Sequence, residues 1–104
     1  MLKISRWVLL ISALCSSGAS VADIGKLKSL VDQAKYEEAY DYANQLMDTL
    51  EGVPAFDLQY AIAAIDTGRL SEGVFALERV LLLDSQNNLA RLELARGLYF
   101  LEKY

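Results

Sequence analysis

The sequence contains no histidine, one cysteine and one proline among its 104 residues. Without histidine, the commonest general base and the commonest metal ligand of enzymes are missing. The single cysteine, Cys15, lies in an N-terminal segment that we expect to be removed, so the remaining chain has neither a disulfide framework nor a thiol nucleophile. Glycine-rich phosphate loops are missing too. We therefore predict that the protein is not an enzyme and holds no cofactor and no metal ion.

Positive charge is also scarce, with ten Lys and Arg residues against 14 Asp and Glu. Removal of Lys3 and Arg6 with the N-terminal segment would leave eight basic residues and a net charge of 8 − 14 = −6. A phosphate backbone is repelled by this balance, so we expect no nucleic-acid partner. The acids are dispersed along the chain, which is typical of solvated helix surface.

The most apolar stretch of the sequence lies near the N-terminus. Lys3 and Arg6 form a basic start, residues 7–15 are mostly apolar, and Ser20-Val21-Ala22 is a small-x-small cleavage site. Residues 1–22 are therefore predicted to be a secretory signal peptide and residues 23–104 one exported domain. The alternative is a retained anchor, but the apolar stretch of about nine residues is short against the roughly 20 that a membrane-spanning helix needs. We expect no membrane span in the mature chain.

A period of 34 residues runs through the rest of the sequence, and it needs no gaps. A basic residue followed by a bulky apolar one recurs in three places, and other apolar and small positions recur with the same spacing. The recurring pairs are Lys35-Tyr36, Arg69-Leu70 and Lys103-Tyr104, then Glu38-Ala39 and Glu72-Gly73, and Leu46 and Val80.

This pattern resembles the tetratricopeptide repeat (TPR), whose unit is two antiparallel helices joined by a tight turn. The recurring segment of that family ends on a small residue, and it appears here at residues 34–39 and 68–73. The small residue, Ala39 or Gly73, is expected where the second helix crosses closest to the first, because a larger side chain would hold the two helices apart.

The resemblance implies an all-α fold, a TPR-like right-handed superhelix of antiparallel helix hairpins with about two and a half repeats. We predict helices over residues 23–34, 37–51, 54–67, 71–84 and 88–103. Helix 88–103 carries an apolar surface wider than one neighbour can cover. The third repeat is incomplete, so either a longer parent chain or a partner would supply its second helix.

The TPR family binds extended or helical peptides in a concave groove formed by the first helix of each unit. Carried over by position, the resemblance implies a partner-binding surface. The residues predicted to form it are Lys28, Leu58, Ile62, Ile65, Leu92, Arg96 and Tyr99, with Val31, Asp32, Asp66 and Phe100 beside them. Only Lys28 and Arg96 are basic, so the surface fits an amphipathic helix better than a C-terminal carboxylate. The alternative is that these residues form core, because periodicity alone cannot separate the two.

A narrower resemblance covers residues 56–104, about half of the chain. Residues 56–58, 63–70, 75–81 and 90–96 are similar to the periplasmic N-terminal repeat region of surface lipoprotein assembly modifiers, which are outer-membrane proteins. It implies a protein exported across the inner membrane to the periplasm that binds a protein or peptide partner, as a truncated relative of an outer-membrane lipoprotein assembly factor. The alternative function is that of an incomplete structural solenoid that forms a homodimer through helix 88–103.

Overall fold

A computed structural model describes residues 20–103, and all regular structure in that range is helical. The all-α prediction is confirmed. Each helix begins and ends within two residues of its predicted range. The helices are α2 (Val21–Asp32), α3 (Tyr36–Leu50), α4 (Pro54–Asp66), α5 (Leu70–Leu83) and α6 (Asn88–Lys103).

The first helix begins two residues before its predicted start. The backbone N–H of Ser20 donates a hydrogen bond of 2.8 Å to the Asp23 carboxylate, which holds the chain in the geometry of a helix N-terminus. Val21 and Ala22 therefore belong to the first turn of α2. Residues 1–19 of the predicted signal peptide lie outside the described residues.

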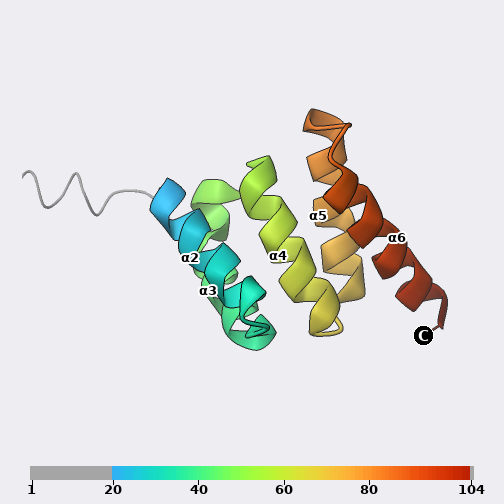
Figure 1. The fold of residues 1–104 in the computed structure, drawn as a ribbon, viewed down its shortest axis with the longest axis horizontal. Helices are drawn as coiled ribbons and strands as arrows, with labels where there is room; N and C mark the ends of the chain where they lie inside the picture. The colour runs from blue at the N-terminus through green and yellow to red at the C-terminus, as the bar shows by residue number, and fades with distance from the viewer. Residues whose placement is uncertain (1–19, 104) are drawn as a thin grey trace, which may run out of the picture.

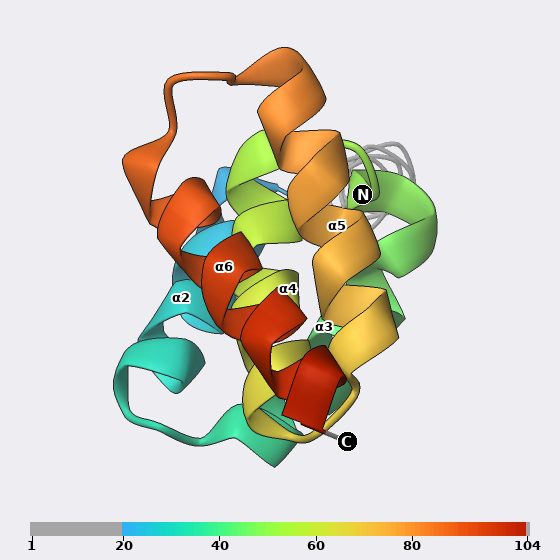
Figure 2. The same ribbon diagram turned by 90° about the vertical axis from the view of Figure 1, so that its right-hand side faces the viewer.

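The helices lie in two layers. Figure 1 shows α2, α4 and α6 nearer the viewer with α3 and α5 behind them, and the turned view of Figure 2 has the same two layers at its left and right. Short turns make successive helices antiparallel, so α2–α3 and α4–α5 are hairpins and α6 follows the second hairpin. Helix α4 lies in the centre and contacts the other four helices.

The repeat in the sequence returns as a repeat in the backbone. Ala34 and Gly68, 34 residues apart, both have positive φ (60° and 85°) and follow the end of a first helix. Lys35 N–H donates to Leu30 O (2.9 Å), and Arg69 N–H donates to Ala64 O (2.8 Å). This long backbone hydrogen bond belongs to the Schellman motif. The two hairpins therefore have the same type of turn.

The links between repeats are not alike. The first passes through Gly52 at φ 93°, with its N–H donating to the Asp57 carboxylate (3.0 Å). The second ends on Asn87, whose Oδ1 accepts a hydrogen bond of 3.0 Å from Ala90 N–H and so caps α6. The second link therefore ends in a side-chain cap, whereas the first link contains a glycine with positive φ.

The core lies around α4, which is apolar on almost every side. Phe56, Ala61, Ala63 and Ala64 are fully buried. They are enclosed by apolar side chains of α2, α3 and α5. A helix with neighbours on all sides must bury nearly its whole circumference, which explains why α4 lacks an ordinary polar face.

None of the helices within residues 20–103 combines the length and the apolarity needed to cross a bilayer.

Candidate functional site

The residues predicted for partner binding lie on the layer formed by α2, α4 and α6, and four of the seven line two separate hollows. One hollow is next to the α5–α6 turn, and the other lies between the C-terminal end of α4 and the second half of α6. Each has a volume of about 450 to 500 Å³. The single predicted groove is therefore a surface with two depressions.

The first hollow joins α2 to α4. Lys28 and Leu58 line it together with Ile24, Pro54 and Gln59, and the α5–α6 turn closes one side. Gln59 is buried, and its Oε1 has no hydrogen-bond partner within the described residues. This hollow has an apolar floor of aliphatic side chains with one unsatisfied amide and a lysine at its edge.

Lys28 is already engaged at that edge. Its Nζ donates to Asp32 Oδ2 at 2.8 Å, one helical turn along α2. Both side chains are exposed, so the pair contributes little to stability and a ligand carboxylate can replace Asp32 at small cost.

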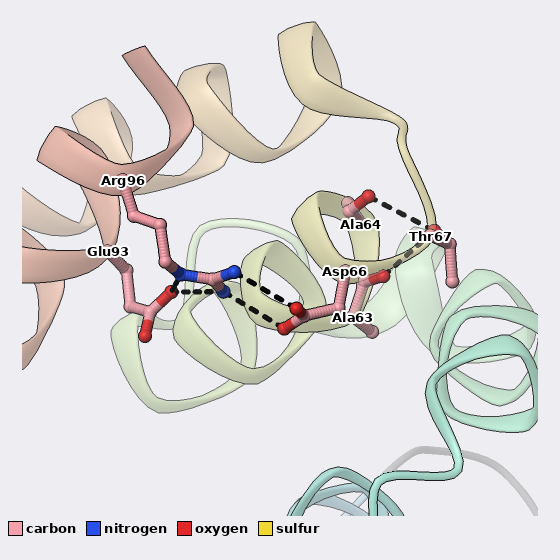
Figure 3. A network of polar contacts seen from close by, with 6 residues as sticks. All are labelled: Ala63, Ala64, Asp66, Thr67, Glu93 and Arg96. Carbon is pink, nitrogen blue, oxygen red and sulfur yellow. Dashed lines mark hydrogen bonds and ion pairs between the residues drawn. The ribbon is translucent and has the colours of Figure 1, made fainter. Parts of the chain in front are cut away.

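The second hollow contains the other predicted cation. Ile65, Leu70 and Phe100 form its apolar lining, and Arg96 and Asp66 lie at its rim. Figure 3 shows Arg96 reaching from α6 toward α4, with its guanidinium facing two carboxylates. The hollow is therefore apolar inside and charged at its edge.

Arg96 donates four hydrogen bonds within the protein, from four of its five N–H groups. Its Nη1 and Nη2 donate to the two oxygens of Asp66 at 2.9 Å each, and Nε and Nη2 donate to Glu93 Oε2 at 2.9 and 2.6 Å. These hydrogen bonds, first those donated to Asp66, raise the pKa of Arg96 above its ordinary value. Two acids around one base leave a net negative charge, so this corner does not offer a free cation to an acidic ligand.

Asp66 is held in place by the end of its own helix. The Thr67 hydroxyl donates to the carbonyls of Ala63 and Ala64 at 2.8 and 3.0 Å, which caps the last turn of α4 (Figure 3). The Asp66 to Arg96 pair therefore ties the capped end of α4 to the middle of α6.

The remaining predicted residues differ in exposure. Leu92 and Tyr99 on α6 are 65% and 55% exposed, whereas Ile62 is half-buried. Ile65 is only 3% exposed and belongs to the core, the role that the sequence left open for these positions. The structure thus brings Lys28 with Leu58 and Ile65 with Arg96, and it leaves Leu92 and Tyr99 on open surface.

A buried charge pair was missed by the sequence reasoning. The Asp57 side chain is almost completely buried in α4, and it accepts hydrogen bonds of 3.3 Å from Nε and Nη2 of Arg79 in α5. A recurrence could have indicated it, because Asp23 lies 34 residues before Asp57 and likewise accepts a hydrogen bond from the second helix of its hairpin, from the Tyr42 hydroxyl at 3.1 Å. Both acids join the first helix of a hairpin to the second.

A second cluster joins the two hairpins through residues of α3, α4 and α5. The hydroxyls of Tyr40 and Tyr60 both donate to Glu72 Oε2, and the two rings stack with centroids 5.7 Å apart. Arg69 lies over the Tyr40 ring and donates to Glu37. These contacts fix α3 against the start of α5, and nothing in their sequence spacing predicted them.

Comparison of the chain with protein-family models, with curated proteins and with solved structures gives no match. The two resemblances therefore depend on the residues of this chain alone. Within residues 20–103, no group of three or more acidic, histidine or cysteine side chains is placed to hold a metal ion.

Proposed function

We propose that the protein is an interaction module that binds a peptide or an amphipathic helix of a partner protein on the layer formed by α2, α4 and α6. The observation that carries the proposal is the pair of apolar hollows on this layer, next to the exposed side chains of Leu92 and Tyr99. Concave apolar surface with a few polar groups at its rim is the usual character of a binding site.

The repeat supports the same proposal. The chain forms two hairpins with the same type of turn, and α6 follows them as the first helix of a third unit. This order of helices is that of a helical-repeat array. We propose that they stack as TPR-like units in a right-handed superhelix. Arrays of this kind act through extended surfaces rather than through catalytic side chains.

The polar groups of the surface favour one class of ligand. Three carboxylates lie at or near the hollows: Asp66 and Asp84 line them, and Glu93 lies beside Arg96. The one lysine there, Lys28, is already paired with a carboxylate. We infer that the ligand presents an apolar stripe flanked by basic residues, because these would meet the surplus of carboxylates.

We further propose that the protein is exported and acts in the periplasm, as a relative of an outer-membrane lipoprotein assembly factor. The basic start, the apolar stretch and the Ser20-Val21-Ala22 site support export. Mass spectrometry of the protein recovered from a bacterial periplasm after expression of the full chain tests this. A mature N-terminus at Asp23 would support export, whereas an uncut cytoplasmic product would contradict it.

Peptide binding is tested by selecting displayed random peptides of helix length on the purified protein and measuring their affinity by fluorescence anisotropy. If the layer of α2, α4 and α6 binds them, Leu58→Ser should weaken the selected peptides about tenfold, as expected when one apolar contact is lost. Leu82→Ser is the matched control, because Leu82 is an exposed leucine (84%) on α5, in the other layer.

Two results would overturn the binding proposal. The first is a selection in which no peptide is enriched over immobilised carrier alone. The second is a set of peptides whose affinity falls with Leu82→Ser and not with Leu58→Ser, since that would place the binding surface on the other layer.

A second candidate function, self-association through α6, is favoured by a different observation. Leu98 of α6 is 49% exposed, although the residue 34 positions earlier, Ala64, is fully buried. An apolar position that is covered in one repeat and open in the next suggests a missing neighbour.

A further inference from the structure

One face of α6 forms a stripe that no other helix in residues 20–103 covers. Arg91, Ala95, Leu98 and Glu102 are spaced at i, i+4, i+7 and i+11, so they lie along one side of the helix, and all four are exposed. We call these four residues the α6 stripe.

The repeat shows what kind of neighbour such a stripe takes. The residues 34 positions before Arg91, Ala95 and Leu98 are Asp57, Ala61 and Ala64, and all three are fully buried. On α4, helix α5 crosses at this face: a Cβ built on Gly73 would lie 3.1 Å from Ala61 O. The corresponding face of α6 is therefore of the type that packs against an antiparallel helix.

The first position of the stripe has a constant role in the two complete hairpins. Asp23 accepts from Tyr42 of α3, and Asp57 accepts from Arg79 of α5, so the side chain here reaches the covering helix. In α6 the position is Arg91, with the opposite charge. A covering helix of the α5 type would place a base against Arg91, so the neighbour of α6 must instead present an acid.

The charges of the stripe are also reversed with respect to its own helix. Arg91 lies near the positive N-terminal end of α6, and Glu102 lies near the negative C-terminal end, so neither is placed to stabilise α6 by itself. No ion pair within the described residues includes either side chain, although Arg91 Nη2 donates to the Ser85 carbonyl at 2.7 Å.

We propose that the α6 stripe binds the α6 stripe of a second copy of this chain, in an antiparallel pair. A two-fold axis between residues 96 and 97 places Arg91 of each copy opposite Glu102 of the other. The same axis places the small Ala95 opposite Leu98, which lets the two helices approach closely. Both ends of the stripe then meet an opposite charge and the apolar centre is covered.

This inference rests on the second candidate function and gives its geometry. It leaves the peptide-binding hollows free, because their residues Leu58, Ile65 and Arg96 are not part of the stripe.

The test is light scattering and analytical ultracentrifugation over a concentration series. The protein is purified after expression of the full chain, and mass spectrometry identifies its N-terminus. We expect a monomer and dimer in equilibrium. Arg91→Glu and Glu102→Arg should each weaken the dimer about tenfold, because each places two like charges face to face across the axis.

The double variant, Arg91→Glu with Glu102→Arg, should restore the wild-type dimer, because it exchanges the two charges and keeps their complementarity. Leu98→Asp should abolish the dimer, and Leu82→Asp on α5 is the control for a new aspartate at an exposed leucine. Circular dichroism checks that each variant stays helical, and loss of dimerisation counts only for variants that do.

The remaining outcomes overturn the proposal in distinguishable ways. The antiparallel pairing is contradicted if neither charge reversal weakens the dimer, or if the double variant does not restore it. Self-association itself would still stand in both cases. A monomer at every concentration contradicts both. A monomer in which a selected peptide protects the α6 stripe from hydrogen exchange would assign the stripe to a different partner and leave the peptide-binding function standing.

Discussion

Gly73 of α5 lies so close to Ile65 of α4 that a Cβ built at position 73 would come within 2.6 Å of Ile65 Cγ1. A Cβ built on Gly97 of α6 would lie 3.1 Å from Cδ1 of the same isoleucine. Three helices therefore meet at Ile65, and both α5 and α6 have a glycine there. The small residue that the repeat predicted at position 73 is confirmed as a close helix crossing.

A larger residue at this crossing should be destabilising. Gly73→Leu is expected to lower the free energy of unfolding by about 1 to 3 kcal/mol through overpacking, even after the gain of about 1 kcal/mol in helix propensity. Denaturant unfolding followed by circular dichroism measures the change. Unchanged stability would mean that α4 and α5 cross elsewhere.

Gly25 provides the matched control for Gly73. It lies inside α2, and a Cβ built on it has no neighbour within 4 Å. Gly25→Ala should therefore stabilise the protein by about 1 kcal/mol, the helix propensity term alone. If both glycine substitutions shift stability in the same direction, packing at Ile65 is not what distinguishes them.

Exchanging alanine and glycine in the two hairpin turns should change stability in opposite directions. Ala34 adopts the left-handed conformation (φ 60°) in which a Cβ is strained, whereas Gly68 occupies the same conformation without a Cβ. Ala34→Gly should raise the free energy of unfolding by about 1 kcal/mol, and Gly68→Ala should lower it by a similar amount. Thermal melts of the two variants check this, and a loss of stability on Ala34→Gly would refute the shared turn.

The buried carboxylate of Asp57 should be important for stability. Without Arg79, the buried Asp57 carboxylate would keep only the hydrogen bond from Gly52 N–H, so Arg79→Leu is expected to cost about 3 kcal/mol. Glu78→Leu, at an exposed position next to it on α5, should change stability by no more than about 0.5 kcal/mol. Equal effects of the two substitutions in denaturant unfolding would argue against a structural role for the pair.

Alkaline pH should weaken the fold through Tyr60. Burial, and then the hydrogen bond donated to Glu72, raise the pKa of Tyr60 above its ordinary value of about 10. Because the folded pKa is the higher one, the contribution to stability is complete below about pH 10 and is lost as the pH rises toward the folded pKa. Urea unfolding between neutral and alkaline pH should show a steeper decline in wild type than in Tyr60→Phe, and identical slopes would contradict this.

Helix positions were predictable because two independent signals agreed. The 34-residue period fixed where each unit repeats, and turn residues such as Gly68 and Pro54 marked the boundaries. The sequence places the start of α2 two residues late, because the predicted cleavage site follows Ala22, whereas the Ser20 to Asp23 hydrogen bond starts the helix at Val21.

Side-chain pairing was much less predictable than helix position. Arg96 was predicted to belong to the partner-binding surface, but Asp66, 30 residues earlier, binds it through both oxygens. Which charges meet across helices depends on crossing angle and rotamer, and neither can be read from spacing. For the same reason, the pair of Asp57 and Arg79 could not be predicted from the sequence.

If the layer of α2, α4 and α6 is the binding surface, an NMR titration will locate the ligand on it. Amide shifts of the isotope-labelled protein are followed as the tightest selected peptide is added. We expect the largest shifts to cluster at Lys28, Leu58, Ile62 and Leu92. Shifts confined to α3 and the outer face of α5, around Asp41 and Phe75, would contradict it.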